Sequence, residues 1–251
     1  MWTGDRQTPN PEPRTPYPGF PPRSLLAVPG VILATTLAGV VQLAASLFDR
    51  SGRISDAIAR AWAWAIARVC GLRVTAAGRE RVDPRRTYVI VANHQSHLDT
   101  IALLLTCPAP MRMLAKKSLF RIPVMGWAMK RMGHVPVERD RATRGSLDRL
   151  RAAVEGLIGR GQSVVVFAEG SRSPDGRVRA FKKGAFHLAR TFDLPILPVA
   201  IDGTARVLPA WTLRFRGGTA RVTYLPPIEP AGREVEDLLA ETRARIVEAL
   251  G

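Results

Sequence analysis

From residue 72 to its end, the chain alternates between short apolar runs and longer segments in which apolar residues recur every three or four positions. Short runs rich in β-branched residues predict buried strands, whereas the longer period predicts amphipathic helices. The predicted strands are residues 73–77, 88–92, 111–115, 134–138, 163–167 and 196–201. The clearest predicted helix covers 146–160, and another, with apolar positions between 235 and 250, ends the chain.

This alternation favours a sheet whose strands are mostly parallel, because parallel strands need long crossover connections, which are usually helical. Two further runs, 213–215 and 220–225, are separated by Gly217-Gly218 and predict a late β-hairpin. The pattern therefore predicts an α/β fold over residues 72–251, with a mixed, largely parallel central sheet flanked by helices.

The preceding residues follow a different pattern. Residues 25–48 carry no charged side chain, and as a helix they would extend roughly 36 Å, enough to cross a hydrocarbon core. Residues 53–72 separate arginines from apolar residues on two helical faces, as in an interfacial helix or a soluble helix packed on a core. The apolar run before them favours the interfacial helix. We expect a membrane-associated segment over 24–71, formed by one span or half of a re-entrant hairpin, plus the interfacial helix.

The first residues and the basic residues near the apolar run set two further expectations. Residues 1–23 contain seven prolines and almost no aliphatic side chains, which predicts a disordered tail. The apolar run is too long and too far from the start for a cleaved signal peptide. Five arginines between 50 and 73 outnumber the three in the tail, so we expect the bulk of the protein on the cytoplasmic face of a membrane.

The composition restricts the partners. Lys and Arg number 37 against 21 Asp and Glu, a formal net charge of +16. This excess favours anionic partners such as nucleic acid, acidic lipid headgroups or phosphorylated small molecules. Cys70 and Cys107 are the two cysteines, and we expect them to be reduced core thiols in a cytosol-facing domain.

The strongest candidate for chemistry follows the strand 88–92. His94 lies where this strand turns into a helix expected to begin near Ser96, and Asp99 lies in the first helical turn. Ligands of open α/β sheets bind at such carboxyl ends of strands. The carboxylate of Asp99 can fold back to the imidazole of His94 and form a general base with an orienting acid. A metal site from these two residues and His97 is an alternative, but the chain has few other histidines and no paired cysteine motif, so we expect no metal.

Two more strands end in polar residues. Glu169, Gly170, Ser171 and Arg172 follow the strand 163–167, and backbone N–H groups with a guanidinium suit a phosphate. An ordinary turn would explain the same residues. Arg139 follows the strand 134–138 in the same way, although an arginine at a strand end is usually a solvated charge.

Four motifs occur in a characteristic order. They are Asn93-His94-x4-Asp99, Gly133-x-x-Pro136-Val137-x-Arg139, Phe167-x-Glu169-Gly170-Ser171-Arg172-Ser173 and Leu194-Pro195-Ile196-Leu197-Pro198-Val199. The set resembles the four sequence blocks of the glycerolipid acyltransferases, in particular the 1-acyl-glycerol-3-phosphate (lysophosphatidic acid) acyltransferase family. Segments that contain Lys116 and Lys182 resemble its connecting segments, and the resemblance covers roughly residues 72–225.

The resemblance implies the glycerolipid acyltransferase fold, with 72–251 as the catalytic domain. It implies that His94 is the general base and Asp99 its partner. It also implies that Arg139 and the 169–172 block (Glu169, Gly170, Ser171, Arg172) contact phosphate and glycerol, with Lys116 and Lys182 as further substrate-binding residues. The acyl donor would be acyl-CoA or acyl carrier protein, the acceptor a lysophospholipid and the surface partner an anionic membrane. No cofactor, metal or nucleic acid is expected.

Three positions depart from the usual family pattern. Ala168 stands where proline is frequent, Ser171 where threonine is frequent and Pro136 where an aromatic residue is common. Since serine keeps the hydroxyl, we expect the change at Pro136 to matter most, through the acceptor headgroup. Two alternatives remain: acyl transfer to another lysolipid, such as a lyso-aminolipid, and a non-catalytic basic protein that binds membrane or nucleic acid.

Overall fold

A seven-stranded sheet forms the centre of the computed structural model, which describes residues 21–49, 52–138, 143–173 and 176–251. The strand order is β1-β7-β6-β2-β5-β3-β4. The strands are β1 (Leu72–Ala77), β2 (Val89–Ala92), β3 (Met111–Lys116), β4 (Val135–Val137), β5 (Ser163–Phe167), β6 (Ile196–Asp202) and β7 (Gly218–Tyr224). Only the β6–β7 pair of this sheet is antiparallel. The predicted mixed, largely parallel sheet is therefore confirmed.

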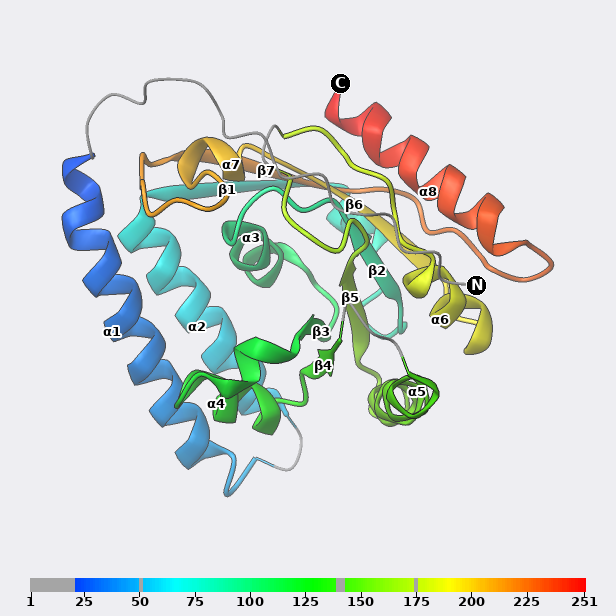
Figure 1. Cartoon of the computed structure of the whole chain (residues 1–251), viewed down its shortest axis with the longest axis horizontal. Helices are drawn as coiled ribbons and strands as arrows, with labels where there is room; N and C mark the ends of the chain where they lie inside the picture. The colour runs from blue at the N-terminus through cyan, green and yellow to red at the C-terminus, as the bar shows by residue number, and fades with distance from the viewer. Residues whose placement is uncertain (1–20, 50–51, 139–142, 174–175) are drawn as a thin grey trace.

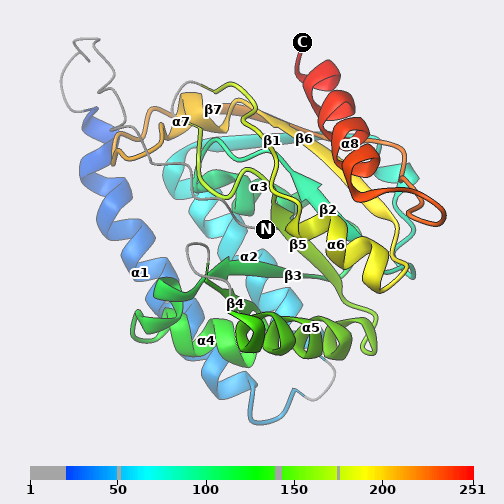
Figure 2. The same cartoon turned by 45° about the vertical axis from the view of Figure 1, so that its right-hand side comes forward.

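Helices cover both faces of this sheet (Figures 1 and 2). On one side lie α5 (Arg144–Ile158), α6 (Gly184–Thr191) and α8 (Val235–Leu250). On the other lie α1 (Pro22–Ala45), α2 (Arg53–Cys70), α3 (Leu98–Thr106) and α4 (Met125–Arg131). The short helices η1 (Arg79–Arg81), η2 (Lys117–Arg121) and α7 (Thr204–Val207) complete the chain.

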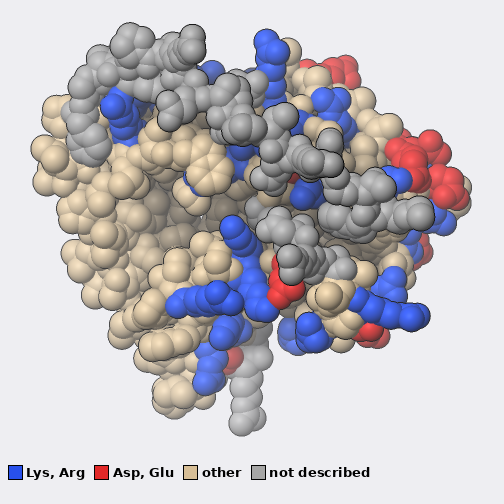
Figure 3. Space-filling view, viewed as in Figure 1, with Lys and Arg blue, Asp and Glu red and all other residues tan. Residues whose placement is uncertain are grey.

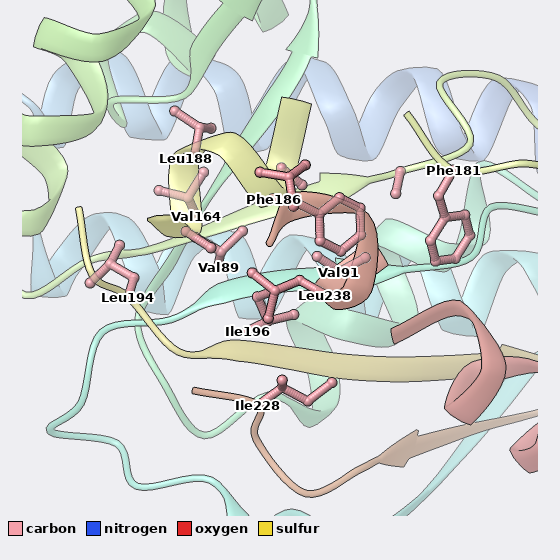
Figure 4. Close-up of a cluster of buried hydrophobic side chains, with 14 of the residues drawn as sticks. Val89, Val91, Val164, Phe181, Phe186, Leu188, Leu194, Ile196, Ile228 and Leu238 are labelled. Atoms are coloured by element: carbon pink, nitrogen blue, oxygen red, sulfur yellow. The ribbon is translucent and has the colours of Figure 1, made fainter. Parts of the chain in front are cut away.

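Strand β2 explains why the sheet lies at the centre. Its four side chains have no exposed surface, and successive residues enter different cores. Val89 and Val91 pack with α5, α6 and α8 (Figure 4), whereas Ile90 and Ala92 pack with α3. A strand buried on both faces reads as a continuous apolar run, as this strand does in the sequence.

The N-terminal pair of helices packs on the sheet side that carries α3. The faces of α1 and α2 that contain Ala27, Ala63 and Ile66 are buried in a third core with residues of α3, β1 and β7. Gln42, the strongly polar residue within the apolar run, is buried, and its amide donates to Ser55 Oγ of α2 at 2.8 Å. The opposite side of α1 is exposed and apolar. Among the described residues, α1 is the one helix with the length and composition to cross a membrane.

Helix α2 packs on the protein with one of its sides. Ala63 and Ala67 of α2 are buried in the third core, which also contains Ala27 of α1. One side of α2 is therefore packed on a core, which leaves the proposed interfacial role of its other side as a prediction. Trp64 remains 61% exposed, and a membrane contact by this side of α2 stays a prediction.

The predicted hairpin is wrong. Residues 213–215 form no strand, and β7 instead lies between β1 and β6. The reason is tertiary: Phe215 is buried in the third core, and its N–H donates to Ser24 Oγ of α1 at 2.9 Å. The N–H of Arg216 donates to the carbonyl of Val207, so the hydrogen bonds that a hairpin would use go elsewhere.

Other boundaries differ by a few residues. Helix α3 begins at Leu98 rather than near Ser96, and α1 begins at Pro22, inside the segment 1–23 predicted to be disordered. Residues 1–20 of that segment lie outside the described residues. Both cysteines are free and buried, as expected.

Candidate active site

The turn after β2 brings the predicted pair into contact. His94 Nδ1 lies 2.8 Å from Asp99 Oδ2, so the carboxylate folds back as the sequence indicated. The backbone N–H groups of Gln95 and Ser96 donate to the same oxygen at 2.7 and 2.9 Å. Asp99 is fully buried, whereas the imidazole retains 12% exposure. The turn thus holds a buried carboxylate against a ring that solvent can reach.

Two polar residues tie this turn to the neighbouring strand β6. Thr204, just past the end of β6, donates its hydroxyl to Asp99 Oδ1. The amide of Asn93 bonds both backbone groups of Ile201, at 2.9 Å to the carbonyl and 2.8 Å from the N–H. Our sequence reasoning missed Thr204. Its signal was a polar residue directly after a strand, but only the strand order puts β6 next to β2.

Strand β5, on the other side of β2, supplies a ring under the histidine. The rings of Phe167 and His94 are stacked, with centroids 4.0 Å apart and planes 15° from parallel. Since β2 and β5 are parallel and Ala92 is level with Phe167, their carboxyl ends meet at the same edge. The stack covers one face of the imidazole, and Phe167 is the second residue at this site to which we had assigned no role.

Glu169 supports the turn through its backbone. Its two carboxylate oxygens accept the N–H groups of His94 at 2.8 Å and Arg179 at 3.1 Å. Burial raises the pKa of this carboxyl group, and the two backbone hydrogen bonds oppose that shift. The observed contacts are to backbone, so a direct contact between Glu169 and substrate stays a prediction.

The connection between β5 and α6 contains Arg172, Arg179 and Lys182, and we call it the basic loop. Gly170 has a φ of +76°, which favours glycine, and a Cβ there would come within 2.8 Å of Lys182 Cε, so the lysine side chain lies directly against this glycine. Ser171 Oγ accepts a hydrogen bond from Arg179 Nη1 at 2.8 Å. The structure therefore brings Lys182 beside the 169–172 block, together with Arg179, which the sequence reasoning did not include.

Arg172 faces an aromatic ring in a different segment. Its guanidinium carbon lies 4.2 Å from the centroid of Trp211, which is within the range of a cation–π interaction. Trp211 belongs to the connection between α7 and β7. The arginine is thereby held near the carboxyl ends of the parallel strands.

Of the remaining predicted residues, Lys116 lies at the same edge of the sheet. Lys116 ends β3 and is exposed. Pro136 is in β4, level with Ala115, and Arg139 lies outside the described residues. Lys and Arg side chains gather in the middle of the face shown in Figure 3. Among the described residues, no three His, Cys, Asp or Glu side chains lie together as a metal site would require.

This arrangement can accept a proton. A carboxylate against Nδ1 favours the tautomer with hydrogen on Nδ1, which leaves the Nε2 lone pair of His94 as a base. The carboxylate also stabilises the imidazolium that forms after proton transfer. The nearby cations Arg172, Arg179 and Lys182 favour an anionic group beside this base.

Comparisons with known proteins point to one family. A family model described as "Acyltransferase" matches residues 73–202. A chloroplastic 1-acyl-sn-glycerol-3-phosphate acyltransferase of Brassica napus is 37% identical over 207 residues, which cover 81% of this chain and 58% of that protein. The human 1-acyl-sn-glycerol-3-phosphate acyltransferase alpha is 31% identical over 170 residues, covering 68% of this chain and 60% of that protein.

A solved structure agrees with these relatives. The crystal structure of the 1-acyl-sn-glycerophosphate acyltransferase PlsC from Thermotoga maritima superposes with a TM-score of 0.76 at 25% identity. The match covers 91% of this chain and 93% of that chain. The chain spans between 44% and 60% of the length of the curated plant and human relatives.

Proposed function

The chain belongs to the acyltransferase family, and from that premise we propose that it makes phosphatidic acid. In this proposal it transfers a fatty acyl group from an acyl thioester, acyl-CoA or acyl carrier protein, to the free hydroxyl of 1-acyl-glycerol-3-phosphate. The observation that carries the proposal is the 2.8 Å contact between His94 Nδ1 and Asp99 Oδ2 beside a basic loop. The printed names of the relatives support the same acceptor.

The reaction requires one base and one departing thiolate. His94 Nε2 takes the proton of the acceptor hydroxyl as its oxygen attacks the thioester carbonyl. The tetrahedral intermediate then expels the thiolate, which receives the proton from the imidazolium. Asp99 orients the ring and stabilises its charged form throughout. The acceptor itself is the nucleophile, so the step needs no covalent enzyme intermediate.

The basic loop supplies the acceptor site. A phosphate near the 169–172 block would meet the Arg172 guanidinium and the Lys182 ammonium, which suit a dianion. Arg139 and Lys116 are proposed as further contacts because they follow the neighbouring strands β4 and β3. No cofactor other than the thioester donor is proposed, because a thiolate leaves readily without a metal ion.

The same proposal places the protein on a membrane. Helix α1 exposes an apolar stripe that includes Leu33 and Leu37, 60% and 57% exposed, while its other side packs on the protein. Because α1 packs on the protein along one side and exposes apolar residues along the other, we favour a helix that lies in one leaflet over a free span. The arginines after the apolar run favour attachment from the cytoplasmic side, where an anionic surface suits the positive chain.

The first prediction tests the base. His94→Ala should lose about 10² to 10⁴-fold in kcat, because it removes the general base. The measurement is thioester-dependent acylation of 1-acyl-glycerol-3-phosphate by the full chain in lipid vesicles, with both donors. His187→Ala is the control, since His187 is exposed on α6, and it should stay within about twofold of wild type.

Three outcomes would change the proposal. Activity of His94→Ala within threefold of wild type would exclude the mechanism. A wild-type protein that acylates lysolipids without a phosphomonoester at least as well would keep the chemistry and change the acceptor. A protein that binds anionic vesicles yet transfers no acyl group from either donor would favour the non-catalytic alternative.

A further inference from the structure

The connection between α7 and β7, residues 208–217, joins two distant parts of the protein. At its start, Ser96 Oγ of the catalytic turn donates to the carbonyl of Leu208 at 2.7 Å. Towards its end, the N–H of Phe215 donates to Ser24 Oγ in the first turn of α1. Leu208 and Phe215 are buried in the third core. Both ends of this loop, which we call the 208–217 loop, are therefore fixed.

The tip of the 208–217 loop carries an unusual residue. Trp211 is 67% exposed and has a φ of +64°. This left-handed conformation is a genuine outlier for a bulky side chain. Such strain persists where the surroundings hold it, and it clusters at functional positions. An exposed and strained tryptophan needs an explanation beyond the stability of the fold.

The contact between Trp211 and Arg172 offers an explanation for this exposed and strained tryptophan. The guanidinium carbon lies 4.2 Å from the ring centroid, so the ring covers one face of the cation. A guanidinium that lies over an aromatic ring can still offer in-plane N–H groups to two oxygens of one phosphate. The stacking also orders the long arginine side chain before the ligand binds. Less conformational entropy is then lost on binding.

We propose that Trp211 is a positioning residue for acceptor specificity: it holds Arg172 in the orientation that binds the acceptor's phosphate. The inference rests on the proposed function and names the element that sets its preference for phosphorylated acceptors. The fixed ends of the 208–217 loop keep the ring in register with the catalytic turn, because Ser96 and His94 belong to the same turn.

The test compares acceptors with and without the phosphate, using the full chain in vesicles. Trp211→Leu keeps an apolar side chain but removes the aromatic face, and KM for 1-acyl-glycerol-3-phosphate should rise roughly three- to tenfold. The kcat value should stay within about twofold, and KM for monoacylglycerol should not change. Trp211→Phe should restore most of the affinity. Leu213→Ala, at an exposed apolar position in the same loop, is the control and should match wild type.

A second pair of variants separates positioning from a general structural role. In an Arg172→Ala background, which should itself raise KM for the phosphorylated acceptor, Trp211→Leu should change KM by less than about twofold, since a residue that acts through Arg172 has no further effect without it. If Trp211→Leu does not fold, Trp211→Asn carries the same test, because asparagine tolerates positive φ.

Three results would overturn the inference. They are an unchanged KM in Trp211→Leu, an equal loss on monoacylglycerol, and a loss that follows weaker vesicle binding, as expected if Trp211 were only a lipid anchor. Failure of the proposed function would be distinct: the wild-type protein would then show no preference for a phosphorylated acceptor, whatever the variants do.

Discussion

Asp99 accepts hydrogen bonds from His94, from two backbone N–H groups and from Thr204 although its side chain is fully buried. A buried carboxylate is costly unless each oxygen is paired. These partners come from the turn after β2 and from the segment that follows β6. The orientation of His94 therefore depends on a residue that is more than a hundred positions away in the sequence.

Thr204 gives the second prediction. Thr204→Val has nearly the same shape but no hydroxyl, so Asp99 Oδ1 loses a donor. Because hydrogen bonds to charged groups contribute about 1.5–3 kcal/mol, we expect kcat/KM to fall on the order of tenfold or more. Thr204→Ser should recover most of the activity. Steady-state kinetics of both variants decide this, and equal activity of the valine and serine variants would contradict the role.

His134 gives the third prediction, for stability against pH. The N–H of Met113 donates to His134 Nδ1 at 3.0 Å. Burial first, and then the charge of Arg112, lower the pKa of His134 to about 3. The unfolded chain, with an ordinary pKa near 6.5, therefore binds more protons than the folded protein between these values, so stability falls as pH decreases.

This effect should cost about 2 kcal/mol of unfolding free energy between pH 7 and pH 5. Urea unfolding at both pH values measures it. His134→Asn retains an acceptor near the N–H of Met113 but does not titrate, so its stability should depend less on pH. An identical pH dependence in this variant would show that other groups are responsible.

Helix α1 illustrates what one element contributes. Its apolar composition extends around the whole helix, yet one side packs on α2 and α4 while Leu33, Leu37 and Val40 stay exposed. An exposed stripe of this kind on a helix is unusual for a surface that meets only water. Helix α1 is therefore both a part of the fold and the proposed membrane contact.

The fourth prediction separates these two roles. Replacing Leu33, Leu37 and Val40 by serine removes exposed apolar surface without touching the packed side. Binding to vesicles should weaken on the order of tenfold or more, while the free energy of unfolding changes little. Leu147→Ser, an exposed apolar position on α5, is the control in the same co-sedimentation assay. Unchanged binding of the triple variant would mean that another surface attaches the protein.

Besides this apolar surface, the protein as a whole carries a strong net positive charge. The face in Figure 3 carries Lys and Arg in its middle, beside the largely uncharged side formed by α1. Charge and apolar contact respond differently to salt. Added salt shortens the Debye length from about 10 Å at 0.1 M to about 3 Å at 1 M, which weakens attraction between exposed charges but not apolar contact. The two proposed contributions to vesicle binding can thus be measured separately.

The fifth prediction follows from that difference. Affinity for anionic vesicles should fall as salt rises and then reach a plateau maintained by α1, whereas binding to neutral vesicles should depend little on salt. The α1 triple variant should lose the plateau. Complete release of the wild-type protein at 1 M salt would indicate that charge alone attaches it.

Sequence pattern alone was sufficient for the elements that local physics controls. The run at β2 predicts a strand because β-branched side chains suit a strand buried on both faces. The spacing of His94 and Asp99, on either side of a turn, predicts their contact. The alternation of strands and helices predicts the mostly parallel sheet, since crossover connections leave few other arrangements.

Other features depend on contacts between distant segments, and these features are visible only in the tertiary structure. Residues 213–215 have a strand-like composition, but Phe215 finds its hydrogen bond and its core contacts at α1. The amphipathic pattern of α2 is compatible with a membrane or a core, and only the tertiary structure shows that one side of this helix packs on the third core. Thr204 reaches Asp99, and Trp211 reaches Arg172, only because the strand order and a fixed loop bring distant segments together. These partners cannot be predicted from the local sequence, because the contacts that bury and hydrogen-bond these residues join segments that are far apart in the chain.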